Sequence, residues 1–288
     1  MAIGIHHRAV RGLDMAYRES GTGDPIVFLH GNPTSSHLWR SVLAHTEHLG
    51  RCLAPDLIGM GLSAKLPDAG AGSYRFVEHR SFLDDLLAGL GVVDRVVLVG
   101  HDWGGVLAMD WARRHPGAVR GLAYLETLTG PVTSDGPNAP SPELFGPLRS
   151  PAGEDLVLID NVFVEVVLPA GTQRRLTATE MDTYRQPYLE PGESRRPTLT
   201  WAREIPLDGH PRDVHDIVVA NAGWMAVTPV PKLLFSGDPG ALLTGPLLEQ
   251  ARAWPSQQEV CVPGSHFLPE DSPDQIGAAL ADWIPALG

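Results

Sequence analysis

The chain has 288 residues, 43% of them hydrophobic and 19% charged, which suits one large domain or a domain that carries an insertion. Its net charge of −12 argues against a surface that binds nucleic acid and favours neutral over anionic substrates. No apolar stretch approaches the roughly 20 residues of a membrane-spanning helix, and the N-terminus lacks the pattern of a signal peptide. We therefore expect a soluble, cytoplasmic protein without nucleic-acid or membrane partners.

Metal and disulfide chemistry are not indicated by the cysteines. Cys52 and Cys261 both lie in apolar stretches, RCLAP and QEVCVPG. A disulfide framework or a zinc site would need more cysteines at closer spacing. We predict that both are small buried side chains, and no metal or organic cofactor is implied.

The first half of the chain predicts an α/β core. The segments DMAYRES and PIVFLH flank the turn signal Gly21–Asp24 and predict two strands joined as a hairpin. Apolar runs and helical spacing then alternate. Strands are predicted at 52–55, 95–99 and 121–125, and helices at 78–90 and 106–115. This alternation indicates a mostly parallel sheet with helices on both faces.

The alternation stops after Leu128, where residues 129–153 are rich in Pro, Gly and Ser. Helices are predicted at 154–168, from Thr177 with a capping partner in Glu180, and weakly at 212–224. Strands return at 232–235 and 259–262, and a last helix begins at a capping Ser272 followed by proline. The core segments 1–129 and 211–288 are thus separated by a helical insertion at 130–210.

The segment Val99–Gly105, VGHDWGG, is the strongest local motif. It follows an apolar strand and precedes a helix, which is the context of the nucleophile elbow G-x-S-x-G, here with Asp102 in the serine position. A carboxylate is ionised at neutral pH and can attack a saturated carbon directly, leaving an alkyl ester that water must hydrolyse. The alternative is an aspartate that only caps the following helix.

The loop HGNPTSS at 30–36 directly follows the strand PIVFL. In an α/β-hydrolase this loop and the residue after the nucleophile supply the two backbone N–H groups of the oxyanion hole, here Asn32 and Trp103. Their side chains, an amide and an indole, are neutral donors that could converge on a departing halide. Taken singly, Asn32 could be a turn residue before proline and Trp103 a core residue.

The general base is predicted to be His266, because the order in this fold is nucleophile, acid, histidine, and His266 follows the last predicted strand. Two carboxylates are candidates for the acid that orients it. Asp238 follows the strand KLLFS but precedes Pro239, which is typical of a turn. Glu126 directly follows a buried strand, where an unpaired carboxylate would be unfavourable, and we favour it.

Together these motifs resemble the haloalkane dehalogenases, in particular a subgroup whose acid follows the strand before the cap. The matching segments run along nearly the whole chain and are HGNPTSSHLWR, DLIGMG, VVLVGHDWG, the Glu after GLAYL, NVFVEVVLP, RRPTLTW and HFLPEDSPDQIG. The resemblance implies an α/β-hydrolase fold with a helical cap, Asp102 as nucleophile, His266 as base and Glu126 as acid. It also implies Asn32 and Trp103 as the halide-stabilising pair.

The same resemblance implies a cofactor-free hydrolysis of a small neutral haloalkane to alcohol, halide ion and proton, by a monomer or homodimer. A pocket lined by Phe145, Phe163 and Leu242 is implied under the cap, although each could be an ordinary core residue. Gly105 stands where relatives often have Ser, and Ala202 where they often have Pro. These departures concern the substrate range more than the reaction.

Three alternatives share the fold. An epoxide hydrolase would use the same aspartate, and Tyr184 and Tyr188 in the cap could protonate its leaving alkoxide, but Asn32 would then have no clear purpose. A luciferase of the coelenterazine type is similar to the same dehalogenase subgroup, and nothing in the chain selects it. A non-catalytic ligand receptor is disfavoured by the complete set Asp102, Glu126 and His266.

Overall fold

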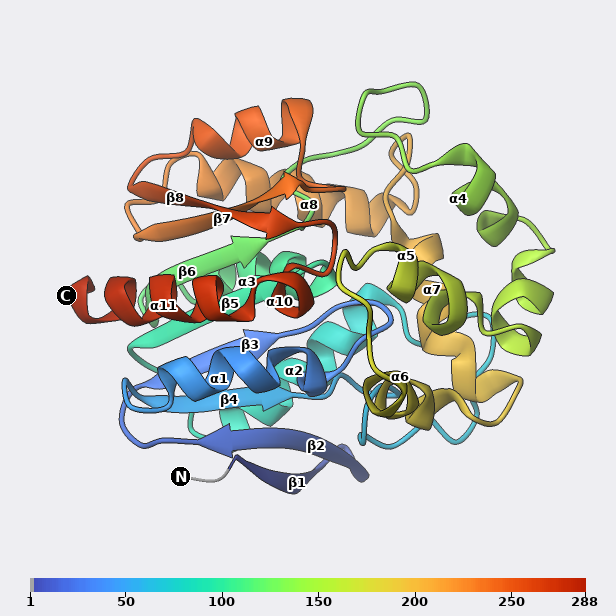
Figure 1. Cartoon of the computed structure of the whole chain (residues 1–288), viewed down its shortest axis with the longest axis horizontal. Coiled ribbons are helices and arrows are strands. Elements are labelled where there is room, and N and C mark those ends of the chain that lie inside the picture. Colours follow the sequence, from blue (N-terminus) through green and yellow to red (C-terminus); the bar gives the residue numbers. More distant parts are fainter. Residues whose placement is uncertain (1–2) are drawn as a thin grey trace.

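The computed structural model describes residues 3–288, and its centre is an eight-stranded sheet in the order β1-β2-β4-β3-β5-β6-β7-β8 (Figure 1). Strands β3 to β8 pair in parallel, whereas β1 and β2 join the sheet antiparallel. The predicted mostly parallel sheet is confirmed. The strands are β1 (Gly4–Val10), β2 (Leu13–Ser20), β3 (Pro25–Leu29), β4 (Arg51–Pro55), β5 (Val96–His101), β6 (Val119–Leu125), β7 (Lys232–Pro239) and β8 (Gln257–Gly264).

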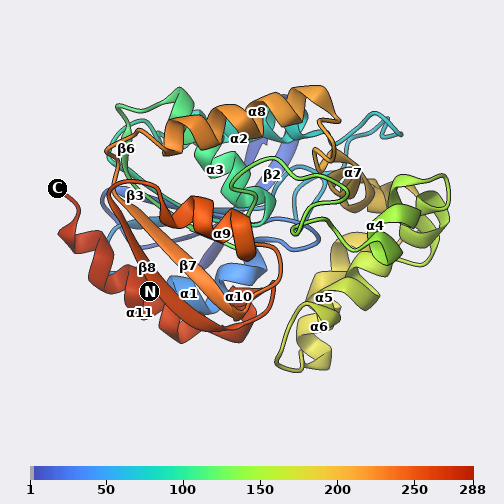
Figure 2. The ribbon, with the colours of Figure 1, turned by 90° about the horizontal axis from the view of Figure 1, so that it is seen from above.

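Helices cover both faces of the sheet, as the alternation predicts (Figure 2). One face packs against α1 (Arg40–Thr46) and α11 (Pro273–Trp283), and the other against α2 (Phe76–Gly89), α3 (Trp103–Arg114) and α8 (Arg212–Met225). The all-apolar interior strands, such as VVLV in β5, are buried by both helical layers. The short helices α9 (Gly245–Arg252) and α10 (Leu268–Asp271) follow β7 and β8.

The predicted hairpin between β2 and β3 is wrong. Strand β2 pairs with β1 and β4, and β3 lies on the far side of β4. The true hairpin joins β1 to β2 through Arg11 and Gly12, both with positive φ, which is the backbone conformation that tight hairpin turns need. The turn residues Gly21–Asp24 instead carry the chain past β4 to the next position in the sheet.

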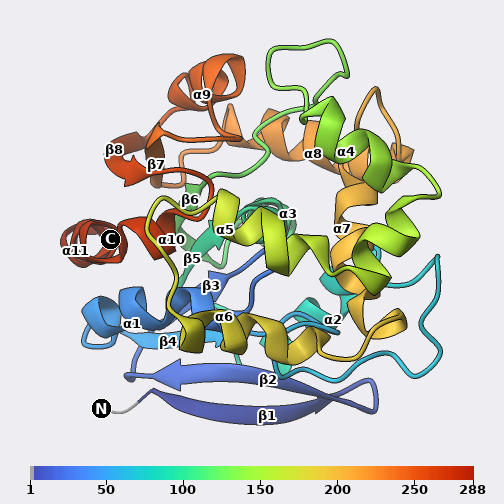
Figure 3. The same ribbon diagram turned by 45° about the vertical axis from the view of Figure 1, so that its right-hand side comes forward.

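The segment between β6 and α8 forms a cap beyond the carboxyl ends of the parallel strands (Figures 1 and 3). Its helices are α4 (Pro142–Arg149), α5 (Leu168–Ala170), α6 (Ala178–Arg185) and α7 (Arg196–Glu204). The single helix predicted over 154–168 is instead two π-helical segments, Asp155–Ile159 and Phe163–Val167. Asn161 separates them with a φ of +55°, which a continuous helix does not tolerate.

Two predicted helix starts have different outcomes. Thr177 and Glu180 form the predicted capping box at α6, in which each side chain accepts from the other residue's backbone N–H. Ser272 does precede Pro273 at the start of α11, but its side chain does not cap the helix. Its hydroxyl donates instead to the carbonyl of Pro263 in β8, at 2.5 Å.

The prediction that both cysteines are buried holds for Cys52 and is wrong for Cys261, whose side chain is exposed. Strand β8 is an edge strand, so its side chains alternate between solvent and core, and the neighbouring Val262 takes the buried side. An apolar stretch in sequence therefore does not place every member in the core.

An ion-pair cluster joins the cap to the core beside the last strand. Glu270 on α10 is 1% exposed and accepts hydrogen bonds from Arg40 of α1 and from Arg174 and Tyr184 of the cap. Glu180 of the capping box accepts from the same two arginines. Because a buried carboxylate needs such partners, this cluster fixes where the cap meets the core.

Candidate active site

The site is built on the turn between β5 and α3, where Asp102 has a φ of +52° and a ψ of −126°. This strained conformation aims the side chain out of the sheet edge. It is possible because the flanking glycines allow close backbone contacts. A Cβ atom on Gly104 would lie 2.1 Å from the carbonyl oxygen of Leu29, and one on Gly100 would lie 2.5 Å from the carbonyl oxygen of Gly104.

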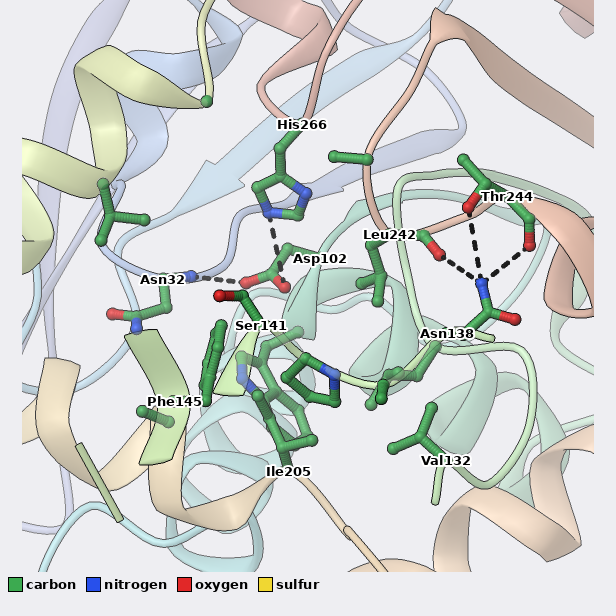
Figure 4. Close-up of a pocket in the computed structure, with 18 of the residues that line it drawn as sticks. Asn32, Asp102, Val132, Asn138, Ser141, Phe145, Ile205, Leu242, Thr244 and His266 are labelled. Carbon is green, nitrogen blue, oxygen red and sulfur yellow. Dashed lines mark hydrogen bonds and ion pairs between the residues drawn. The ribbon is translucent and has the colours of Figure 1, made fainter. Parts of the chain in front are cut away.

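The two oxygens of the Asp102 carboxylate have different surroundings. Oδ2 accepts a 2.8 Å hydrogen bond from the backbone N–H of Asn32, and the backbone N–H of Trp103 also donates to the carboxylate. Oδ1 lies 3.7 Å from Nε2 of His266 (Figure 4). Burial raises the pKa of the Asp102 carboxyl, and this outweighs the lowering by the His266 charge and the two backbone donors.

His266 is held in place through Nδ1, the ring nitrogen that does not face Asp102. Nδ1 donates to Oε2 of Glu126 at 3.2 Å, so Nε2 is the atom that faces Asp102. Burial lowers the pKa of His266, but the Glu126 hydrogen bond and the charge of Asp102 outweigh it and leave this pKa above its usual value. The arrangement is a carboxylate, an imidazole and a second carboxylate in line.

Glu126 is fully buried at the end of β6 and is satisfied by the loop after β7. The backbone N–H groups of Ala241, Leu242 and Leu243 all donate to its two oxygens, at 2.7 to 3.4 Å. These three donors fix the position of the carboxylate, whose Oε2 also faces Nδ1 of His266.

The second candidate acid, Asp238, is exposed near the end of β7. Its backbone carbonyl accepts from the side chain of Gln173, and no interaction joins its carboxylate to His266 among the described residues. The turn with Pro239 that the sequence suggested is wrong, because both residues belong to β7 and pair with Pro263 and Gly264 of β8. The structure brings Glu126, and not Asp238, to the histidine.

Between the core and the cap lies a cavity of about 280 Å³, and Asp102 and His266 open into it (Figure 4). All three residues suggested for the pocket, Phe145, Phe163 and Leu242, line it, and so do Asn32 and Trp103. Other lining residues are Val106, Leu128, Val132, Val167, Ala202, Ile205 and Phe267. No lysine or arginine is among the described residues that line the cavity, so it suits an uncharged, largely apolar ligand.

Comparisons with known proteins agree with this geometry. Residues 24–273 match the model of the alpha/beta hydrolase fold family. A haloalkane dehalogenase of Sphingobium indicum is 52% identical over 279 residues, which cover 96% of this chain and 94% of that protein. One of Mycolicibacterium smegmatis is 47% identical over 281 residues, covering 97% and 90%. The chain belongs to the haloalkane dehalogenase family.

The fold of the family is also matched in a solved structure. The crystal structure of the haloalkane dehalogenase DbeA from Bradyrhizobium elkani is 41% identical, covers 99% of both chains and superposes with a TM-score of 0.93. The dehalogenase described here is thus a hydrolase with an α/β-hydrolase fold. No helix within residues 3–288 is long and apolar enough to cross a membrane.

The two neutral donors of this dehalogenase are held by the cap. The Asn32 amide Nδ2 donates one hydrogen bond to the carbonyl of Thr198, at 3.0 Å, which leaves its second N–H free for a ligand. The Trp103 indole stacks on Trp201 of α7 at 4.7 Å between ring centroids, and Trp201 in turn stacks on His79 at 4.3 Å. Both donors are therefore fixed before any ligand arrives.

The residues that hydrogen-bond to Asn32, Asp102 and His266 from outside the cavity were not identified from the sequence. Thr198 fixes the Asn32 amide, and the hydroxyl of Thr127 donates to the carbonyl of Asp102 at 2.7 Å. The His101 ring interacts through Nε2 with the carbonyl of His266, at 2.8 Å, and burial holds the pKa of His101 well below its usual value. Only His101 carried a signal, as a polar residue inside the apolar run that precedes Asp102.

Proposed function

We propose that this dehalogenase hydrolyses neutral haloalkanes through a covalent ester on Asp102, with His266 as base and Glu126 as orienting acid. The observation that supports this most directly is the unequal setting of the two Asp102 oxygens. The Asn32 backbone N–H holds Oδ2, the Trp103 backbone N–H also donates to the carboxylate, and Oδ1 lies nearest to Nε2 of His266. One oxygen is thus free to attack while the other already occupies an oxyanion hole.

In the first step Oδ1 of Asp102 bonds to the carbon that carries the halogen, and the carbon–halogen bond breaks with its electron pair going to the halide. Asn32 and Trp103 line the same cavity, and their side-chain N–H groups stabilise the departing anion. Because both donors are uncharged, they bind a weakly hydrated halide without attracting carboxylates strongly.

In the second step a water oxygen attacks Cγ of the ester while Nε2 of His266 takes its proton. The negative charge that develops on the former Oδ2 is stabilised by the backbone N–H groups of Asn32 and Trp103. Collapse breaks the bond between Cγ and the alkoxide oxygen, and the alkoxide takes the proton from His266 to leave as alcohol. The carboxylic acid that remains loses its proton and restores the carboxylate. The net products are alcohol, halide and one proton.

Charge changes in the site separate these two steps. In the free enzyme the Asp102 charge helps to raise the pKa of His266. Formation of the ester neutralises Asp102, so that contribution disappears and the pKa of His266 falls. The histidine therefore becomes a competent neutral base at the stage at which a base is required.

The epoxide-hydrolase alternative receives less support from the cap. Tyr184 donates to the buried Glu270, and the Tyr188 hydroxyl is buried without a hydrogen-bond partner. Neither tyrosine is among the described residues that line the cavity. An epoxide opened by Asp102 would therefore lack a tyrosine within reach of its leaving oxygen.

The test is halide release from 1-bromobutane and 1-chlorobutane, measured beside the hydrolysis of styrene oxide. We expect the fastest halide release from 1-bromobutane and little hydrolysis of styrene oxide. The variant His266→Phe is then incubated with 1-bromobutane and digested. A butyl group should be found on the peptide that carries Asp102, because the ester forms but is not hydrolysed.

The double variant His266→Phe with Asp102→Asn is the matched control and should remain unmodified. Equal or better turnover of the epoxide would reverse the choice of substrate. An unmodified Asp102 peptide in His266→Phe, despite release of bromide by the wild type, would reject the covalent route and leave direct attack by water.

A further inference from the structure

One wall of the cavity is formed by the Pro- and Gly-rich segment that runs from β6 to α4. Residues Pro137 to Ser141 line the cavity on this side, opposite the loop of Leu242 and Thr244 that follows β7. The amide of Asn138 crosses between them (Figure 4). Its Nδ2 donates to the carbonyl of Thr244 at 2.9 Å and more weakly to the carbonyl of Leu242 at 3.4 Å.

Nδ2 also donates to Oγ1 of Thr244 at 3.5 Å, and among the described residues these Asn138 hydrogen bonds alone tie residues 135–140 to the core. The other hydrogen bonds of this stretch are local, from Gly136 to the carbonyl of Thr133 and from Ala139 to that of Gly136. The anchors on either side lie outside it, at the contact of Val132 with Leu207 and in helix α4. A segment of small residues with one cross-connection depends on that connection for its position.

A second pocket of about 190 Å³, open to solvent, adjoins the first at Asn138. It is lined by the same segment and by Pro246, Leu247 and Gln250 of α9. Val132, Pro137 and Asn138 line both cavities. The Asn138 bridge therefore stands where the catalytic cavity would extend into the second one.

We propose that Asn138 is a specificity-determining residue that limits the length of the substrate by clasping the segment 135–140 to the loop of Leu242 and Thr244. This inference rests on the proposed function, because it concerns the same cavity. With the bridge in place, the alkyl chain is confined to the 280 Å³ cavity. Without the Asn138 hydrogen bonds, the segment 135–140 moves away from Leu242, and the alkyl chain of the substrate can extend into the second pocket.

The chemistry of the bridge explains why an amide is used. Two carbonyl oxygens converge on Asn138, and an NH₂ group can donate to both, whereas a carboxylate of the same shape would repel them. The Leu242 loop itself is held independently, since its backbone N–H groups donate to Glu126. Breaking the clasp should thus move the cap segment and leave the orientation of His266 intact.

The experiment compares the wild type with Asn138→Asp, which is isosteric, and with Asn138→Leu. Asp135→Asn is the matched control, because Asp135 lies exposed in the same segment. Kinetic constants are measured with 1-bromobutane and 1-bromohexane. We expect the ratio of kcat/KM for 1-bromohexane to that for 1-bromobutane to rise about fivefold in both Asn138 variants, which corresponds to the loss of one hydrogen bond. The change should come from a lower KM for 1-bromohexane and not from a higher kcat. The control should keep the wild-type ratio.

Two further readouts separate this role from a general disturbance. The pH profile of kcat should be unchanged in the Asn138 variants, because Glu126 and His266 are not displaced. Amide hydrogen exchange at residues 136–141 should become faster in Asn138→Asp and not in Asp135→Asn. An equal loss for both substrates, or an unchanged ratio with unchanged exchange, would overturn the proposal. Absence of halide release by the wild type would reject the proposed function, whereas the exchange result would still report on the clasp.

Discussion

The carboxylate of Glu126 lies 3.2 Å from Nδ1 of His266 and comes from a different strand end, 140 positions earlier in the chain. Because Glu126 accepts at Nδ1, the imidazole presents its other nitrogen toward Asp102. This orientation supports the proposed role of His266 as the base for a water that attacks the Asp102 ester.

The variant Glu126→Gln tests this relationship. The amide can keep some of the hydrogen bonds from the Leu242 loop, but it provides no negative charge to stabilise the imidazolium. We expect kcat to fall by about four orders of magnitude, as for the orienting acid of a serine-protease triad. The burst of halide from the first turnover should persist, because alkylation of Asp102 does not need the base.

Rapid-quench measurement of bromide, together with the mass of the Asp102 peptide, distinguishes the two steps. The control is Asp238→Asn, which removes the exposed carboxylate of the other candidate acid and should leave kcat within about twofold of the wild type. A large loss in Asp238→Asn with little loss in Glu126→Gln would exchange the roles of these two residues.

The pH dependence follows from the raised pKa of His266. The imidazole must be neutral to accept a proton from water, so hydrolysis of the ester slows as the pH falls through the pKa that His266 has in the alkylated enzyme. Alkylation needs the ionised Asp102 and does not need a neutral imidazole. Burial raises the pKa of Asp102, so alkylation also slows in acid, and the proposal requires that it does so at a lower pH than hydrolysis of the ester.

We therefore expect the fraction of alkylated enzyme in the steady state to increase as the pH is lowered. Acid quenching of turnover mixtures at several pH values, followed by mass measurement, gives this fraction directly. In Glu126→Gln the hydrogen bond that raises the pKa of His266 is weakened, so the acid limb of kcat should move to lower pH. A fraction of ester that falls as the pH is lowered would contradict this order of ionisations.

The two proposed halide donors can be tested with substitutions that remove the side-chain N–H and keep the rest of the residue's contacts. Trp103→Phe keeps an aromatic ring to stack on Trp201 but removes the indole N–H. Asn32→Leu removes the amide while its backbone N–H still donates to Asp102. Each should lower the rate of alkylation about a hundredfold, which is typical for the loss of one preorganised donor to a developing anion.

The measurement is the single-turnover rate of bromide release. Hydrolysis of a preformed ester should change far less, because the oxyanion hole is made of backbone groups in both variants. Trp201→Phe is the control for packing, since it disturbs the same stack and leaves both donors in place. A loss in Trp201→Phe as large as in Trp103→Phe would mean that packing, and not the indole N–H, is what the reaction needs.

The sequence was sufficient for features that a short segment determines. The elbow around Asp102 depends on adjacent glycines and a buried strand, so VGHDWGG predicts it, and the capping box of Thr177 and Glu180 is equally local. The partner of β2 was not predictable in this way, because β4 lies far along the chain and pairs with it across the sheet. A turn signal says that the chain reverses and not which strand it then joins.

Side chains whose role depends on distant carbonyls also escaped prediction. The hydroxyl of Ser272 has the sequence context of a helix cap, but the carbonyl of Pro263 lies within its reach and takes the hydrogen bond. Asn138 stands in a stretch typical of an irregular loop, and its function comes from two carbonyl groups more than 100 residues later. Such contacts follow from the tertiary structure alone.

Gly105 provides a test of packing behind Asp102. A Cβ atom on Gly105 would lie 2.4 Å from Oγ1 and 2.6 Å from Cβ of Thr127, so a larger residue at this position requires Thr127 to move. Gly105→Ser should therefore lower the free energy of unfolding by about 2 kcal/mol, as for an overpacked core. It should also lower activity, because the displaced Thr127 hydroxyl no longer donates to the carbonyl of Asp102.

Replacement of Thr127 by Ala in the Gly105→Ser background removes the atoms that would clash and should restore most of the stability. Thr127→Ala alone should cost about 1 kcal/mol through the lost hydrogen bond, so the two changes together are less harmful than the sum of the single ones. Urea unfolding of the four proteins gives the coupling energy. Additive effects would show that Gly105→Ser is accommodated elsewhere, whereas a favourable coupling means that these two positions determine together how closely the helix behind Asp102 packs on the sheet.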